Sequence, residues 1–147
     1  QQLQKRYGHV SAERVISGAG LVDLYHALCD LKDGQGREIT TPAEVIERAQ
    51  EVPISTANEA LDMFCGFLGS VAGDLALTLG ARGGIYIGGG IVPRLAERFD
   101  ASPFRERFEA KGRFKKYLQD VPTWVIQSPV SPALQGASQA LSLTQWQ

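Results

Sequence analysis

The sequence has few cysteines, and they form neither of the patterns in which cysteines usually carry function. Its 147 residues contain two, Cys29 and Cys65, which lie far apart and form no CxxC or metal-ligand spacing. This arrangement fits a reducing cytoplasm better than a disulfide framework. We therefore expect both to be buried as small apolar side chains, in a cytoplasmic protein without a metal site in this chain.

An excess of charge and a long apolar run are also missing. Fifteen lysines and arginines stand against sixteen aspartates and glutamates, which gives a formal net charge of −1. Such a balance provides no electrostatic reason to expect a nucleic-acid partner or an anionic membrane surface. No apolar run approaches the roughly 18–20 residues of a membrane span. The sequence thus predicts a soluble chain that binds neither nucleic acid nor a membrane.

Methionine occurs once, at Met63, and the chain begins at Gln1 without a targeting pattern. The remaining composition is ordinary for a globular protein, and the length suffices for one domain with a core. We expect residues 1–147 to be part of a longer polypeptide and to form a single, incomplete domain.

The most informative segment covers residues 83–93, where a short apolar strand runs into three glycines and then into a helix. Gly88, Gly89 and Gly90 can take positive φ and let a ligand approach the backbone closely. Ile91 leads into a helix with Pro93 in its first turn, whose free N–H groups attract phosphate or ribose oxygens. A tight turn without a ligand explains the same residues, because the glycines lack a fixed fingerprint spacing. The residues alone leave both interpretations open.

Helix signals dominate the rest of the chain. Capping boxes begin helices at Thr41-Pro42-Ala43-Glu44 and at Thr56-Ala57-Asn58-Glu59. We expect a helix from Ser11 to be disturbed at residues 18–20 and to resume at 21–31. Further helices are predicted at 1–7, 42–51, 56–79, 92–99, 102–109, 113–118 and 132–141, and a second strand at 123–127.

The predicted helix 56–79 has an unusual glycine content. Its apolar residues at spacings of three and four predict one core stripe: Leu61, Cys65, Leu68, Ala72, Leu75 and Leu79. Gly66, Gly69 and Gly73 each cost about 1 kcal/mol of helix propensity relative to alanine. Close packing of another helix or strand would explain them, and self-association through this face is the alternative. Acidic residues in the segment, such as Asp74, argue against a membrane helix.

Basic and aromatic residues alternate between Phe104 and Tyr117. Six lysines and arginines stand here against two glutamates, a mixture that also occurs in proteins that bind RNA or single-stranded DNA. Because the whole chain is nearly neutral, we favour amphipathic helices whose phenyl rings face the core.

The two predicted strands are each followed by a helix, which indicates a parallel pair. Two parallel strands do not form a stable sheet alone, so further strands are expected upstream of Gln1. The fold class predicted from the residues is therefore α/β, with a high helix content.

Several separated motifs resemble those of bacterial glucokinases, in the same order and over nearly the whole chain. The first runs from Tyr7 to Leu21 and contains His9-Val10-Ser11-Ala12-Glu13-Arg14, and the second is the segment 83–93. Lys111-Gly112-Arg113-Phe114-Lys115 and Ala133-Leu134-Gln135-Gly136-Ala137 follow. The resemblance implies the C-terminal portion of an actin-like (ribonuclease H-like) ATPase domain. Residues 1–147 would then be the C-terminal segment of the large domain of such a sugar kinase.

The resemblance also implies an activity and roles for individual residues. The reaction would be transfer of the γ-phosphoryl group of ATP, with Mg2+, to the 6-hydroxyl of D-glucose by a cytoplasmic homodimer. Glu13 would accept hydrogen bonds from sugar hydroxyls, although an acid in a first helical turn needs no ligand to explain it. Gly88, Gly89, Gly90 and Ile91 would contact the adenosine of ATP.

Other parts of the family pattern are missing. The family's catalytic aspartate follows an asparagine, whereas the only asparagine here, Asn58, precedes Glu59. The phosphate-binding motifs are missing as well, so we expect no catalytic residue in this chain, Mg2+ bound mainly by upstream residues, and no activity of the chain alone. The alternatives are a non-catalytic sugar-responsive regulator, another hexose or N-acetylhexosamine kinase, and an interaction module.

Overall fold

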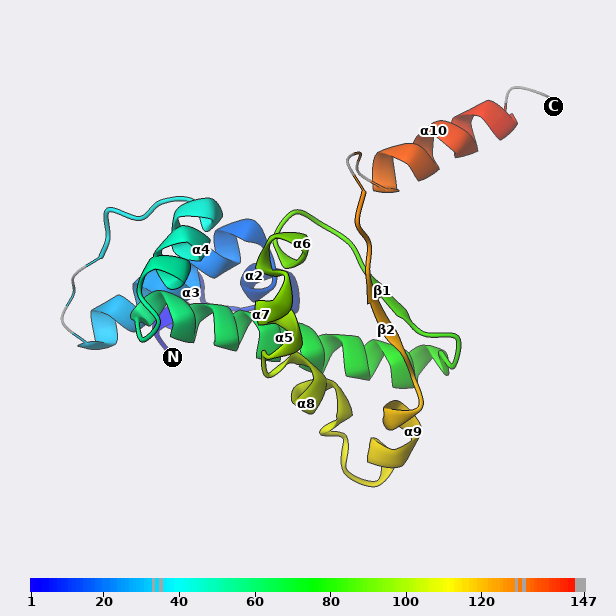
Figure 1. Cartoon of the computed structure of the whole chain (residues 1–147), viewed down its shortest axis with the longest axis horizontal. Helices are drawn as coiled ribbons and strands as arrows, with labels where there is room; N and C mark the ends of the chain where they lie inside the picture. The colour runs from blue at the N-terminus through cyan, green and yellow to red at the C-terminus, as the bar shows by residue number, and fades with distance from the viewer. Residues whose placement is uncertain (33, 35, 129, 131, 145–147) are drawn as a thin grey trace.

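The computed structural model describes residues 1–32, 34, 36–128, 130 and 132–144, and it is built mainly of helices (Figure 1). Helix α5 is the central element. Helices α2, α3 and α4 pack around its first half, and α8 and α9 pack beside its second half. The elements are α1 (Gln2–Tyr7), α2 (Ala12–Val15), α3 (Gly18–Lys32), α4 (Pro42–Glu51), α5 (Thr56–Leu79), β1 (Ile85–Ile87), α6 (Val92–Leu95), α7 (Glu97–Asp100), α8 (Phe104–Glu109), the 3₁₀ helix η1 (Gly112–Phe114), α9 (Lys115–Gln119), β2 (Thr123–Val125) and α10 (Pro132–Thr144).

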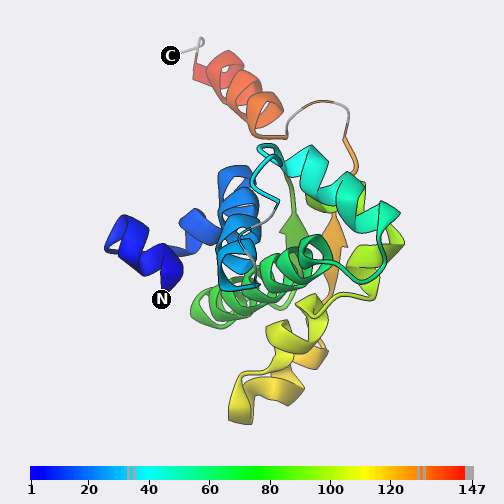
Figure 2. The same ribbon diagram turned by 90° about the vertical axis from the view of Figure 1, so that its left-hand side faces the viewer.

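The two strands form a parallel pair, as the sequence predicted. Tyr86 pairs with Trp124 in the centre of the register, and their rings stack with centroids 4.9 Å apart. The Trp124 ring also covers Gly84, where a Cβ would overlap it. Beyond β2, Ile126 N–H donates to the Ile87 carbonyl oxygen at 2.9 Å. Figure 2 shows both strands beside α5, whereas α10 extends away from the other helices.

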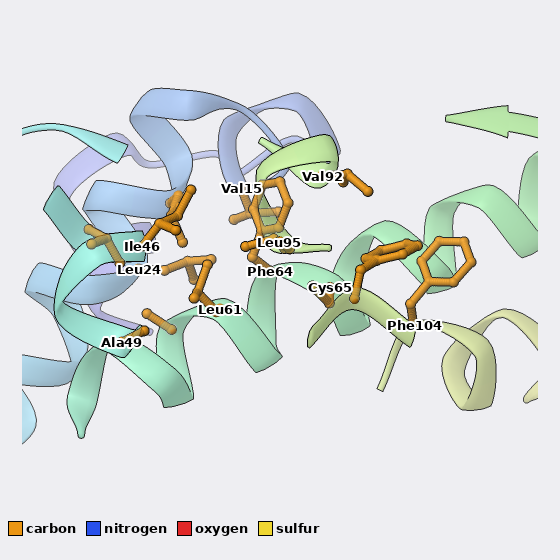
Figure 3. Close-up of a cluster of buried hydrophobic side chains, with 14 of the residues drawn as sticks. Val15, Leu24, Ile46, Ala49, Leu61, Phe64, Cys65, Val92, Leu95 and Phe104 are labelled. Carbon is orange, nitrogen blue, oxygen red and sulfur yellow. The ribbon is translucent and has the colours of Figure 1, made fainter. Parts of the chain in front are cut away.

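The core lies where α2, α3, α4 and α5 meet α6, the short helix that follows the three glycines. Figure 3 shows side chains from α2, α3, α4, α5 and α6 gathered above α5, among them Val15, Leu24, Ile46, Leu61 and Leu95. All five are buried. Burial of apolar surface contributes about 25 cal/mol per Å², so this cluster stabilises the packing of these helices.

The predicted stripe on α5 is correct for most of the helix and wrong at its end. Leu61, Cys65 and Ala72 are buried and Leu68 is partly buried, whereas Leu75 and Leu79 are 51% and 74% exposed. In the last turns the buried residues are Gly73 and Ala76. The buried side changes because α8 and α9 pack against this half of α5.

Helix α8 explains two of the glycines in α5. A Cβ at Gly69 would overlap the Phe104 carbonyl oxygen, and a Cβ at Gly73 would overlap that of Phe108. The predicted close approach of a second helix is therefore confirmed. Self-association through this face is wrong, because α8 of the same chain already covers it.

Several helices differ from the sequence predictions in a boundary, a break or a capping residue. The break after α2 lies at residues 16–17, and Gly18 to Gly20 belong to α3, where Gly20 allows contact with the Arg14 carbonyl oxygen. Helix α5 is capped by Ser55, whose hydroxyl accepts from Asn58 N–H at 3.3 Å, so Thr56 is not the cap. The predicted helix 92–99 is divided at Ala96, which has φ +47°.

The capping box that begins α4 is confirmed. The Thr41 hydroxyl accepts from Glu44 N–H at 3.3 Å, and the Glu44 carboxylate accepts from Thr40 and Thr41 N–H at 2.7 and 2.9 Å. These bonds satisfy N–H groups that a helix start leaves free.

By length and hydropathy alone, α5 could cross a membrane, with 24 residues and a mean hydropathy of 1.4 over its most apolar window. The sequence expectation concerned uninterrupted apolar runs, and Asp62 and Asp74 divide this helix into shorter ones. Half of that window is buried inside the molecule. Three carboxylates of α5 form ion pairs: Glu59 with Lys32 at 2.6 Å, Asp62 with Arg98 at 3.0 Å, and Asp74 with Lys111 at 2.8 Å. This packing is typical of a core helix.

The basic and aromatic segment packs largely as predicted. Phe104 and Phe108 are buried, with ring centroids 6.0 Å apart, whereas Phe114 is 44% exposed. The Arg105 guanidinium donates to the carbonyl oxygens of Leu118, Gln119 and Val121 at 2.9–3.0 Å. Part of the basic charge therefore holds α8 to the end of α9.

Candidate functional site

The three glycines form an exposed turn between β1 and α6, which we call the glycine turn (Gly88, Gly89 and Gly90). Gly89 has φ +119°, a conformation that residues with a Cβ rarely adopt. A Cβ at Gly90 would meet no atom within 4 Å, so the space beside it is open. Ile91 lies at the N-cap of α6, which is only four residues long, so the helix predicted over 92–99 is not continuous behind the turn.

The glycine turn forms one wall of a cleft of about 480 Å³. Segments distant in sequence form the rest: residues 16–18 before and at the start of α3, residues 41–43 at the start of α4, and Phe64 and Leu68 of α5. Ile87, Ile91, Val92 and Arg94 complete the lining. The cleft thus joins the predicted adenosine segment to Ser17 and to the capping box of α4.

The lining consists mostly of apolar residues and glycines, and its two hydroxyls accept hydrogen bonds from backbone N–H groups. The Ser17 hydroxyl accepts from Gly20 N–H at 3.1 Å, and that of Thr41 accepts from Glu44 N–H. The N–H groups of Thr40 and Thr41 hold the pKa of the Glu44 carboxyl below its usual range. An apolar cleft with a few polar groups at its edge suits a planar ring with polar substituents.

Glu13 lies outside this cleft. It occupies the first turn of α2, where Ser11 caps the helix by accepting from Arg14 N–H at 3.2 Å. Its side chain is exposed, and no described residue forms an ion pair or hydrogen bond with the carboxylate. The structure therefore separates the two parts of the predicted site, with Glu13 four residues before cleft residue Ser17.

A second, larger cavity of about 890 Å³ lies between α1, α2, α3 and α5. Its lining includes His9, Val15, Leu24 and Phe67, and it is mainly apolar. Helix α1 is held beside it by Asp23, whose carboxylate accepts from Arg6 and from the Tyr7 hydroxyl, both at 2.7 Å. That hydrogen bond to Asp23 raises the pKa of Tyr7. Neither arrangement brings together groups for catalysis.

Within the described residues, no three His, Cys, Asp or Glu side chains are grouped as metal ligands would be. We therefore assign no step to a metal held by the described residues. The two cysteines are buried as predicted, and burial raises the pKa of Cys65 to about 11.

Sequence reasoning missed two contributors to the cleft. Residues 41–43 were recognised only as a helix start, because nothing local indicates that α4 faces a turn some fifty residues later. Arg94 was not singled out, although its place four residues after Gly90 is a usable signal.

Comparison with known proteins identifies the family. The family model described as Glucokinase matches residues 1–144. The chain is 55% identical over 137 residues to the glucokinase of Chromobacterium violaceum, across 93% of this chain and 39% of that protein. It is 54% identical over 134 residues to the glucokinase of Nitrobacter hamburgensis, across 91% of this chain and 41% of that protein.

A solved structure agrees with these matches. The crystal structure of glucokinase from an Antarctic psychrotroph superimposes with a TM-score of 0.78 at 40% identity, over 86% of this chain and 39% of that one. The chain therefore spans about two fifths of the length of the relatives it matches. The predicted fold class, a helix-rich α/β fold, is confirmed. The resemblance to bacterial glucokinases is confirmed as well. Because the family model matches residues 1–144, the chain belongs to the glucokinase family.

Proposed function

We propose that the full-length protein is a glucokinase that transfers the γ-phosphoryl group of ATP to the 6-hydroxyl of D-glucose. The bond between the γ-phosphorus and ADP breaks, a bond to the sugar oxygen forms, and the hydroxyl proton passes to a carboxylate base. The cleft between the glycine turn and α4, in a chain of this family, is the observation that carries the proposal.

The glycine turn is proposed as one wall of the adenosine site, through Gly88, Gly89, Gly90 and Ile91. Without Cβ atoms the turn leaves its backbone open to a ribose or a base, and the apolar lining opposite can cover a purine ring. Ser17 lines the same cleft, which supports a place for it near the base.

Glu13 is proposed to bind the sugar. An exposed carboxylate without a described partner keeps its acceptor oxygens available for hydroxyl groups, and such charge-assisted bonds are stronger than those of an amide. We propose that the catalytic base, the phosphate-binding loops and most of the Mg2+ ligands belong to residues outside this chain. The 147-residue chain alone would then be inactive. A cytoplasmic homodimer is proposed from the family resemblance.

A coupled assay of glucose 6-phosphate formation tests this function. The full-length protein should phosphorylate glucose with ATP, and the 147-residue chain alone should not. Glu13→Gln should weaken glucose binding, whereas Glu47→Gln, which changes an exposed glutamate of α4, should not. Glucose binding without phosphorylation would favour a sugar-responsive regulator, and a preference for another hexose would reassign the substrate. Sedimentation of the full-length protein tests the dimer.

A further inference from the structure

Arg94 is the one charged residue that lines the cleft, within the part of the chain that the structure describes. Its side chain is exposed and forms no ion pair or hydrogen bond with any described residue. Arg98, four residues later, is different, because its guanidinium donates to Asp62 and to the Asn58 carbonyl oxygen at 3.0 and 3.1 Å. Of the two arginines, only Arg94 is left with its charge uncompensated.

The backbone around Arg94 is well fixed. Val92 and Leu95 on the same helical turn are 5% and 4% exposed, so they anchor α6 in the core. Arg94 N–H donates to the Ile91 carbonyl oxygen at 2.9 Å. Pro93 restricts the first turn, and Ala96 with φ +47° ends the helix directly after Leu95. A rigid turn therefore presents Arg94 at the cleft beside the glycine turn.

No acidic side chain lines the cleft among the described residues. The acid closest in sequence to the opposite wall, Glu44, accepts hydrogen bonds from its own capping box. A guanidinium at the edge of an otherwise uncharged, mainly apolar cleft favours a ligand that combines a ring with an anionic group. A nucleotide has this chemistry, and a nucleoside lacks the anion.

We propose that Arg94 binds the phosphates of the nucleotide and makes this cleft prefer nucleotides to nucleosides. The inference rests on the proposed adenosine site and adds a binding residue to it. Because the guanidinium is exposed, salt should screen the attraction over a Debye length of about 8–10 Å. Affinity for phosphate-bearing ligands should therefore fall with ionic strength more steeply when Arg94 is present.

Titration calorimetry of the full-length protein with ADP and with adenosine tests the role of Arg94. In Arg94→Gln, ADP should bind about tenfold more weakly, equal to 1.4 kcal/mol, with adenosine unchanged. Arg94→Lys should recover part of the ADP affinity. Arg113→Gln is the control, since it removes an exposed arginine that lies outside the cleft. The salt dependence of ADP binding should flatten only in Arg94→Gln.

An unchanged ratio of ADP to adenosine affinity in Arg94→Gln would overturn the inference. An equal loss of affinity for both ligands is one such result, because it would mean that Arg94 acts on the base or on folding. If the unaltered protein bound neither ADP nor adenosine, the proposed adenosine site itself would be wrong, and the inference with it.

Discussion

The backbone of Gly69 in α5 lies directly against the Phe104 carbonyl oxygen in α8, so closely that a Cβ would overlap that oxygen. The next glycine toward the N-terminus, Gly66, has room, because its Cβ would lie 3.5 Å from Cγ of Arg107. Two glycines of one helix therefore differ in what a methyl group would meet. Backbone cannot move aside as the end of a flexible side chain can.

Gly69→Ala should lower the free energy of unfolding by about 1–3 kcal/mol, as inserted atoms in a packed interior do. Gly66→Ala should be neutral or stabilising by up to about 1 kcal/mol, because alanine has the higher helix propensity. Urea unfolding of both variants measures the difference. Equal stability of the two would show that α8 does not pack against Gly69 as described.

Asn58 links the end of α4 to the start of α5. Its buried amide nitrogen donates to the Ala49 and Val52 carbonyl oxygens at 3.0 and 2.7 Å. Asn58→Asp would place a carboxylate against these acceptors, so we expect a loss of about 2–3 kcal/mol at neutral pH. The pKa of the new acid should be raised in the folded state, so the loss should shrink as pH falls.

Gln50→Glu makes the same change of amide to carboxylate at an exposed position of α4. Its effect should stay within about 0.5 kcal/mol. Thermal or urea unfolding at pH 5 and pH 7 compares the two variants. A loss in Asn58→Asp no larger than in the control would contradict the role given to Asn58.

Glu44 should make the start of α4 sensitive to acid. The N–H groups of Thr40 and Thr41 lower its pKa in the folded state. Its contribution is therefore fully present above the pKa of the unfolded chain and is lost as pH falls through the folded pKa. The difference in stability between the unaltered protein and Glu44→Gln should narrow on acidification. A difference that stays constant with pH would contradict this cause.

Local sequence signals predicted much of the fold. They failed where contacts between distant segments decide the structure. Thr41 and Glu44 lie within one turn, so their capping box was readable from sequence. Ser55 and Thr56 are both good caps, and only the backbone geometry decides for Ser55. The break at Ala96 has no sequence signal, because alanine ordinarily favours a helix.

The candidate site shows the same limit. The glycine turn was found from its own residues, because a glycine triplet after a strand is unusual. Its partner, the start of α4, could not be found this way, since the two segments meet only through packing around Phe64 and Leu68 of α5. Glu13 was assigned through family resemblance, and its role in sugar binding stays a prediction.

The central claim is that the space beside the glycine turn holds ATP. A Cβ at Gly90 meets no atom within 4 Å, and the same is true of Gly83, which lies before β1 and outside the cleft. Neither glycine has a positive φ, so side chains are tolerated at both. Valine at either position should leave the melting temperature nearly unchanged, but only valine at Gly90 enters the cleft.

The most direct measurement is the affinity of the full-length protein for ATP in Gly90→Val and Gly83→Val, with Gly90→Ala as an intermediate step. We predict that Gly90→Val binds ATP at least about tenfold more weakly, a loss of about 1.4 kcal/mol, while Gly83→Val binds normally. Unchanged ATP affinity in a folded Gly90→Val protein would contradict the nucleotide site proposed for this cleft.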